Sequence, residues 1–245
     1  MRLSRCSQVL QNYSVKIVAG FLALGIASTL ALPTSAFAKS KPSHTATSTK
    51  ADRLAGVTVS VKAQQMAAWI LDSGDNGGLP FIIIDKPAAK AFVFSKDGQL
   101  LGAAWVLIGL ARGDDSLPGI GTMPLSAITP KMRTTPAGRF VARLGQDLDP
   151  AEVLWVDYNN AISLHRVINT DPSERRLERI VSPNPSDHRI SFGCINVPIP
   201  FFDKVVKPTF QEQKGVVYIL PDANTLQAVF PNYYDVRDTA HPGAD

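Results

Sequence analysis

One stretch in the last third of the chain combines residue types that suit covalent acyl chemistry. It runs from Arg189 to Pro198 and places Cys194 directly after Gly193, among apolar residues. A cysteine attacks a carbonyl carbon as thiolate, so it needs a base or cation beside it and hydrogen-bond donors for the oxyanion that forms. Because Gly193 can adopt backbone conformations closed to other residues, it could aim the amides around Cys194 at one point. Cys194 is therefore the candidate nucleophile.

Two histidines are candidate bases for this thiol. His165 lies in a segment with a strand pattern, where alternation places it on the face of Ser163, opposite Ile162 and Leu164. His188 lies in a proline-flanked loop, six residues before Cys194. We interpret His188 as a solvent-exposed loop residue; the alternative is a second imidazole at the site.

The first 38 residues have the pattern of a secretory signal peptide. An apolar run from Ile17 to Leu32 precedes Ala36-Phe37-Ala38, a small-x-small sequence that signal peptidase prefers. We expect cleavage after Ala38 and an exported protein of the bacterial periplasm or cell envelope. The alternative is an uncleaved anchor helix, although the run is shorter than the roughly 20 apolar residues of a membrane span.

Cleavage would change both the charge and the cysteine content of the chain. The signal carries three basic residues and no acid, so the net charge of +4 and the pI of about 9.1 do not indicate a nucleic-acid partner or strong membrane association. Cys6 would leave with the signal. Cys194 would then be the sole cysteine in an oxidising compartment: buried and inert, paired with another chain, or reactive.

The composition and the hydrophobic pattern predict a mainly β fold. An apolar content of 45% with 19% charged residues is typical of a chain that buries a core. Many short apolar or alternating runs with few helices predict an antiparallel β-sandwich or small barrel. The runs are 81–85, 90–94, 100–106, 139–144, 152–158, 161–167 and 215–220, with short helices within 57–71, 173–179 and 201–206. The long turn-rich segment 109–133 is expected to cover a site.

These patterns divide the chain into five parts. They are a signal peptide (1–38), a flexible tether (39–56), a helix and loop packing on the main domain (57–78), the main domain (79–222) and a loose C-terminal tail (223–245). Trp69 is expected to anchor the core, and Asp85 to be a surface turn residue. His44 and His241 fall in predicted flexible ends, and no Cys/His cluster has metal-ligand spacing, so no metal or cofactor is expected.

The segment 79–222 resembles the YkuD-type L,D-transpeptidases, cysteine enzymes that modify peptidoglycan. The resemblance rests on four segments. The first is Ser191-Phe192-Gly193-Cys194-Ile195-Asn196, which follows a histidine on a predicted strand, and the second is Thr135-Pro136-Ala137-Gly138-Arg139-Phe140. The other two are the hairpin 81–98 and the strand 216–219. The chain differs from the family pattern in having Phe192 where histidine is usual. It also has a longer gap after the histidine, which makes 171–189 an inserted, substrate-facing loop.

The resemblance implies an activity and a set of site residues. Cys194 would attack the amide between the third, L-centred residue and the terminal D-alanine of a tetrapeptide stem, with His165 as general base and acid. Backbone amides of Gly193 and Cys194 would form the oxyanion hole. The thioester would pass to an amine of a second stem or of a lipoprotein lysine.

Supporting roles and alternative functions stay open at this level. Arg189 could bind a stem carboxylate or be an exposed loop arginine. Ser191 and Asn196 are expected to support the backbone of the motif. Hydrolysis of the same thioester would make the protein an L,D-carboxypeptidase or another stem-cleaving hydrolase. A non-catalytic wall-binding module is the second alternative.

Overall fold

The structure is a computed structural model that describes residues 59–147 and 151–239. The predicted signal peptide, the tether, Cys6, His44 and His241 lie outside these residues, so their assignments remain predictions.

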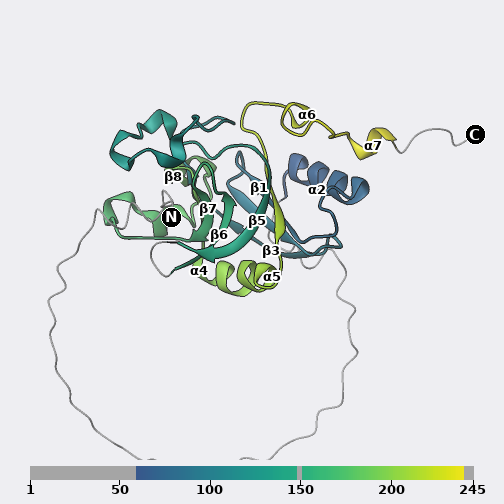
Figure 1. Cartoon of the computed structure of the whole chain (residues 1–245), viewed down its shortest axis with the longest axis horizontal. Coiled ribbons are helices and arrows are strands. Elements are labelled where there is room, and N and C mark those ends of the chain that lie inside the picture. The colour runs from purple at the N-terminus through teal and green to yellow at the C-terminus, as the bar shows by residue number, and fades with distance from the viewer. Residues whose placement is uncertain (1–58, 148–150, 240–245) are drawn as a thin grey trace, which may run out of the picture. The chain divides into compact units, whose positions relative to one another are not determined.

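The described chain is mainly β, which confirms the predicted fold class (Figure 1). The eight strands of the large sheet, in spatial order, are β3 (Leu100–Trp105), β2 (Lys90–Phe94), β1 (Phe81–Asp85), β10 (Gly215–Ile219), β5 (Gly138–Gln146), β6 (Glu152–Asp157), β7 (Ile162–Arg166) and β9 (Ile195–Val197). Two further strands, β4 (Ile108–Gly109) and β8 (Arg189–Ser191), form a separate pair. Most neighbours are antiparallel, but β1–β10, β7–β9 and β4–β8 are parallel.

Helical segments are short, apart from the first. They are α2 (Val61–Ser73), α3 (Arg176–Arg179), α4 (Ile199–Phe201), a π-helical turn (Phe202–Val206), α5 (Lys207–Phe210), α6 (Leu226–Val229) and α7 (Val236–Thr239). Five 3-10 turns lie at Ile120–Thr122, Leu125–Ala127, Pro130–Met132, Pro172–Glu174 and Pro185–His188.

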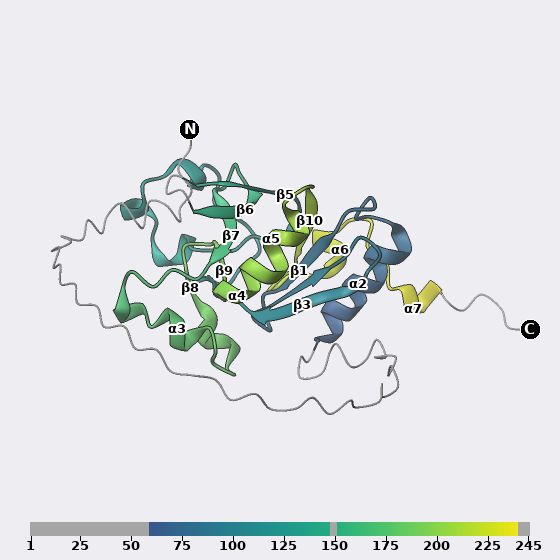
Figure 2. The same cartoon turned by 90° about the horizontal axis from the view of Figure 1, so that it is seen from below.

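Alternation along the central strands builds two hydrophobic layers, one on each face of the sheet. In β1, Ile82 and Ile84 join one buried cluster, whereas Phe81 and Ile83 join the other. The first cluster is closed by the helical segment 199–210, which lies across the sheet in Figure 2. The second is closed by α2 and the C-terminal residues. Because both faces are covered, β1 is buried along its whole length.

Helix α2 packs on the sheet through a predicted core residue. Its N-terminus is capped by Ser60, whose Oγ accepts a hydrogen bond from the amide of Ala63 at 3.1 Å, and it ends at Gly74 with φ of 67°. Trp69 is buried and lies edge-on to Tyr218 with ring centroids 6.4 Å apart. The prediction that Trp69 anchors the core is confirmed.

Two predictions about exposure are wrong. The segment after β10 is not a loose tail as far as Thr239, because Leu226, Phe230 and Tyr233 are buried in the α2 layer. Asp85 is a turn residue but not a surface one: it is buried, accepts the amide of Ala88 at 3.1 Å and bonds the hydroxyl of Ser60. The polar residues near each segment led us to predict solvent exposure, whereas contacts with residues far away in the sequence bury both segments.

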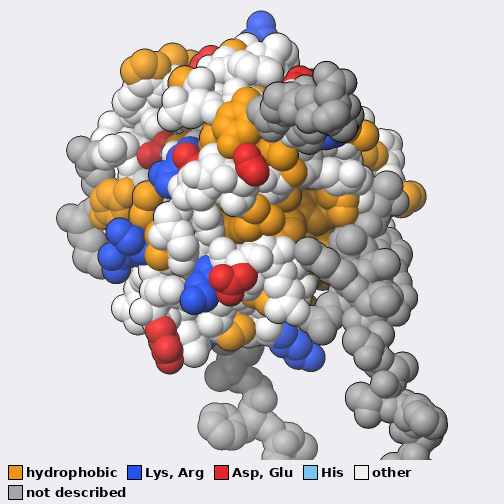
Figure 3. Space-filling model, turned by 90° about the vertical axis from the view of Figure 1, so that its right-hand side faces the viewer, with side chains coloured by type: hydrophobic (Ala, Val, Ile, Leu, Met, Phe, Trp, Pro, Cys, Tyr) orange, Lys and Arg blue, Asp and Glu red, His pale blue; other side chains and the backbone are white. Residues whose placement is uncertain are grey.

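Hydrophobic side chains also reach the surface on the side of the molecule that carries α2 and α7, where Figure 3 shows an apolar patch among scattered charges. Within 59–147 and 151–239, no helix is both long enough and apolar enough to cross a membrane.

Candidate active site

Parallel pairing of β7 with β9 brings the two predicted chemical residues to neighbouring strands. The register pairs Leu164 with Ile195 and His165 with Asn196, so Ser163 lies beside Cys194. The hydroxyl of Ser163 is 3.8 Å from the Cys194 sulfur, and the carbonyl oxygen of Ala161 is 3.6 Å from it. Alternation then places His165 on the same face of the sheet as Ser163 and Cys194.

His165 is held as a neutral imidazole with one nitrogen unpartnered among the described residues. Its Nδ1 lies 2.7 Å from the carbonyl oxygen of Arg166, a contact that favours the Nδ1–H tautomer. Its Nε2 is buried and has no hydrogen-bond partner in the part of the chain that the structure describes. Burial lowers the pKa of His165 to about 4; the nearby charge of Arg176 also lowers it, against the opposing effects of the Arg166 carbonyl and of Asp147. The unpartnered Nε2 can therefore accept a proton at neutral pH.

Cys194 is almost fully buried, with 2% of its surface exposed. Its sulfur is disulfide-bonded in the structure. A nucleophilic Cys194 requires the reduced form.

The turn before Cys194 is closed by Ser191. The Ser191 hydroxyl donates to the carbonyl oxygen of Cys194 at 2.6 Å and accepts the amide of Gly193 at 3.1 Å. Gly193 has φ of 129°, a conformation that favours glycine. Because its amide is already engaged, a Gly193 contribution to the predicted oxyanion hole requires this hydrogen bond to open. Ser191 stabilises the loop.

Thr135 joins the Cys194 loop to the strand pair β4–β8. Its buried hydroxyl donates to the carbonyl oxygen of Gly193 at 2.7 Å and accepts the amide of Gly109 at 2.8 Å. Thr135 belongs to the Thr-Pro-x-Gly sequence that carries part of the family resemblance. The structure gives that threonine a physical role: it fixes the peptide next to the candidate nucleophile.

Replacing Thr135 with valine should therefore lower the free energy of unfolding by about 2–4 kcal/mol, because it strands a buried carbonyl and a buried amide. Chemical denaturation of the reduced protein measures this. Thr135→Ser keeps the hydroxyl and should cost much less, and Thr134→Val is the neighbouring control. Equal losses for Thr134→Val and Thr135→Val would contradict the assigned role.

The inserted segment contributes a buried arginine that the sequence did not single out. Arg176, in α3, donates from Nη1 to the side-chain oxygen of Asn196 at 2.9 Å and pairs with Glu174. The Nδ2 of Asn196 lies 3.4 Å from the carbonyl oxygen of Cys194. Asn196 thus supports the backbone of the motif, and Arg176 holds Asn196. The insertion therefore contacts the Cys194 motif through Asn196.

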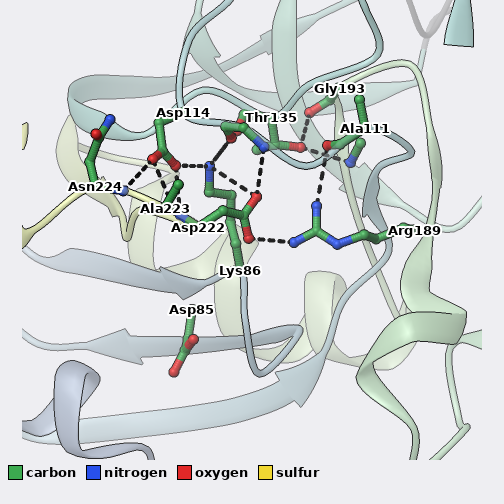
Figure 4. A network of polar contacts seen from close by, with 12 residues as sticks. Asp85, Lys86, Ala111, Asp114, Thr135, Arg189, Gly193, Asp222, Ala223 and Asn224 are labelled. Atoms are coloured by element: carbon green, nitrogen blue, oxygen red, sulfur yellow. Dashed lines mark hydrogen bonds and ion pairs between the residues drawn. The ribbon is translucent and has the colours of Figure 1, made fainter. Parts of the chain in front are cut away.

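Arg189 is neither the exposed loop arginine nor the open carboxylate receptor that we considered. It is buried and donates from Nη2 to Oδ1 of Asp222 at 2.5 Å, with a second contact to the carbonyl oxygen of Ala111 at 3.3 Å. Figure 4 shows this ion pair as part of a network around Lys86. The guanidinium is therefore occupied by the protein itself.

His188 is not solvent-exposed, which corrects our interpretation. It is fully buried, with Nδ1 3.0 Å from the carbonyl oxygen of Val106 and Nε2 2.9 Å from that of Ser182. Its ring stacks on Trp105 at a centroid separation of 5.0 Å. Both nitrogens are engaged by the backbone, so His188 links loops and is not a second base.

Phe192, which replaces the usual histidine, packs against the long segment 109–133. It contacts a small cluster formed by Ile120, Leu125 and Ile128, and the guanidinium of Arg133 lies over its ring, 3.7 Å from the centroid. The segment predicted to cover a site therefore contacts the Cys194 loop through Phe192.

Among the residues that the structure describes, no group of three or more histidine, cysteine or acidic side chains could hold a metal ion.

No family model matches the chain, and no curated protein is significantly similar to it. Solved structures match parts of the chain at low identity and low TM-score. A fused Zn-dependent amidase/peptidase/peptidoglycan-binding domain-containing protein from Clostridium acetobutylicum is 17% identical over 65% of this chain and 61% of its own, with a TM-score of 0.36. A variant of the helical cell shape determining protein Pgp2 from Campylobacter jejuni is 16% identical over 68% and 58%, with a TM-score of 0.40.

An L,D-transpeptidase from Xylanimonas cellulosilytica is 14% identical over 70% of this chain and 77% of its own, with a TM-score of 0.35. The chain thus spans about three fifths of the length of the first two proteins. At these TM-scores the likeness establishes neither family nor activity for this chain.

Proposed function

We propose that this protein, with Cys194 reduced, is a peptidoglycan L,D-transpeptidase. One observation carries the proposal: the unpartnered, buried Nε2 of His165 lies on the strand next to the one that begins beside Cys194. A neutral imidazole without a partner is the group that a thiol needs to become a nucleophile. The motif resemblance of 79–222 supplies the substrate class, an amide of a tetrapeptide stem.

The reaction divides into two acyl transfers. The proton of the Cys194 thiol passes to Nε2 of His165 as the sulfur bonds the carbonyl carbon of the third, L-centred residue. The amide C–N bond then breaks, and His165 returns the proton to the departing D-alanine nitrogen. An acceptor amine attacks the thioester, loses a proton to His165 and leaves a new amide with the thiol restored. A stem amine is the acceptor we propose; a lipoprotein lysine has the same chemistry.

The surroundings of the two residues suit these steps. Ser163 contacts the sulfur directly, and Ser191, Thr135 and Asn196 fix the carbonyls on either side of it. Such fixed positioning supplies the proximity that acyl transfer requires.

The test is incubation of the reduced, purified protein with muropeptides that carry tetrapeptide stems. Crosslinked dimers with release of D-alanine support transfer, and Cys194→Ala should abolish both. A mass increment on Cys194 equal to the tripeptide stem less one water would identify the thioester.

Two results would redirect the proposal. Monomeric tripeptides without dimers would make the protein an L,D-carboxypeptidase, since water and amine compete for one thioester. Binding of peptidoglycan by both the unchanged protein and Cys194→Ala, with no product from either, would support the non-catalytic module.

A further inference from the structure

An arginine beside the Cys194 loop, Arg133, has no hydrogen-bonding partner among the residues that the structure describes. The guanidinium of Arg133 makes no hydrogen bond or ion pair within 59–147 and 151–239, and its Nε atom is buried. The other arginines close to the site are occupied, because Arg176 binds Glu174 and Asn196 while Arg189 binds Asp222. A buried guanidinium nitrogen without an acceptor costs free energy, and a bound ligand could supply the acceptor.

The guanidinium of Arg133 lies over the ring of Phe192. The central carbon of the guanidinium lies 3.7 Å from the ring centroid, and this contact engages none of the N–H donors, which can therefore bind a planar, bidentate acceptor. The backbone of Arg133 is also fixed, because its carbonyl accepts the amide of Ala111 at 3.0 Å and its amide donates to Pro130 at 3.3 Å. A side chain at Gly109 would collide with the Arg133 carbonyl. The receptor is therefore preorganised.

Its position relative to the nucleophile limits what it can bind. Phe192 is two residues before Cys194, so their Cα atoms are at most about 7.6 Å apart. The hydroxyl of Thr135, two residues after Arg133, donates to the carbonyl oxygen of Gly193, so an acceptor held against Arg133 lies beside the loop that carries Cys194. Burial lowers the pKa of Arg133, and the charge of Glu174, which is paired with Arg176, opposes this effect.

We propose that Arg133 binds the carboxylate of the leaving amino acid, so that the protein selects peptides whose scissile amide is followed by a free C-terminal carboxylate. Carboxylate is the anion whose geometry matches the open guanidinium edge. The assignment rests on the proposed acyl-transfer function and adds a specificity residue to it. Phe192 then serves as the platform for Arg133.

The first test compares two donors, a tetrapeptide ending in a free carboxylate and the same peptide as its C-terminal amide. Arg133→Gln should lower kcat/KM for the acid about 10- to 100-fold, mainly through KM, and should change the amide little. Arg133→Lys, which keeps the charge but not the fork, should lie between. Lys131→Gln, an exposed change in the adjacent turn, is the matched control. An equal loss for acid and amide, or no loss, would overturn the proposal.

The second test needs no turnover. In the reduced protein, the ratio of Cys194 alkylation rates by iodoacetate and by neutral iodoacetamide should fall several-fold in Arg133→Gln and stay constant in Lys131→Gln. An unchanged ratio of alkylation rates would show that the Arg133 charge does not act at Cys194, and would contradict the assignment. If the unchanged protein processes no peptide while the ratio still falls, the proposed function and the leaving-group assignment fail, and an anion-binding arginine remains.

Discussion

Replacing His165 with glutamine should lower turnover of a tetrapeptide stem by about 10²- to 10⁴-fold, because it removes the group that moves the proton. Glutamine is close in size to histidine and can donate to the Arg166 carbonyl as Nδ1 does. The loss should therefore appear in kcat, with the protein still folded. Steady-state release of D-alanine by the reduced protein measures it. Activity within threefold of the unchanged protein would exclude His165 as the base.

The pH dependence gives a second, independent signature of the same residue. Because burial lowers the pKa of His165 to about 4, the imidazole stays neutral well below the usual histidine range. The acid limb of kcat/KM is therefore expected near pH 4 and not near 6.5.

Stability should follow the same shift. A histidine whose pKa is lower in the folded state contributes stability that is fully present above its unfolded pKa of about 6.5 and is lost as the pH falls toward 4. The loss amounts to about 3 kcal/mol by pH 4. In His165→Gln, this contribution to the dependence of the unfolding free energy on pH should disappear.

Cys194→Ala is the matched control for these measurements. It also lacks activity but keeps His165, so its unfolding free energy should retain the acid slope between pH 6.5 and 4. If the slopes of Cys194→Ala and His165→Gln coincide, the titrating group is elsewhere.

Replacing Lys86 with methionine should lower the free energy of unfolding by about 3–5 kcal/mol, since it removes one partner of a buried charge network. The Lys86 Nζ atom lies 3.0 Å from Oδ1 of Asp114 and 3.6 Å from Oδ2 of Asp222, and none of these side chains is more than 4% exposed. It also donates to the carbonyl oxygens of Gly113 and Thr135, at 2.6 and 2.9 Å. Figure 4 shows these contacts converging on the ammonium group, with Asp85 turned away.

The network extends from the end of β1 to the residue before Cys194. Asp222 bridges Lys86 and Arg189, while Thr135 accepts from Lys86 and donates to Gly193. Burial alone would raise the pKa of Asp114, but hydrogen bonds from the amides of Asn224 and Asp222 and from Lys86 lower it to about 2. Asp114 thus stays charged in the methionine variant, with its cation missing.

Two further variants make the Lys86 prediction decisive. Lys96→Met, in an exposed turn, should change stability by less than about 0.5 kcal/mol. Lys86→Met combined with Asp114→Asn removes both charges and should recover part of the loss. A Lys86→Met variant as stable as Lys96→Met, measured by chemical denaturation, would show that the network does not stabilise the fold.

Local pattern was enough for most of the strands. The runs 81–85 and 90–94 match β1 and β2 residue for residue, because alternating apolar side chains and flanking turn residues are read within a few positions. Strands β8 and β9 have three residues each and were not predicted from the sequence, because they gain stability only by pairing with β4 and β7.

The sequence by itself determined the mainly β fold, the pairing of Cys194 with His165 as candidates, and the place of the turns. Only the tertiary structure decided which charged side chains are available. Asp222 occupies Arg189, two carbonyl groups occupy His188, and Arg133 remains open on Phe192. Each of these outcomes depends on partners at least six and up to 82 positions away, whose contacts arise only when the sheet brings distant segments together.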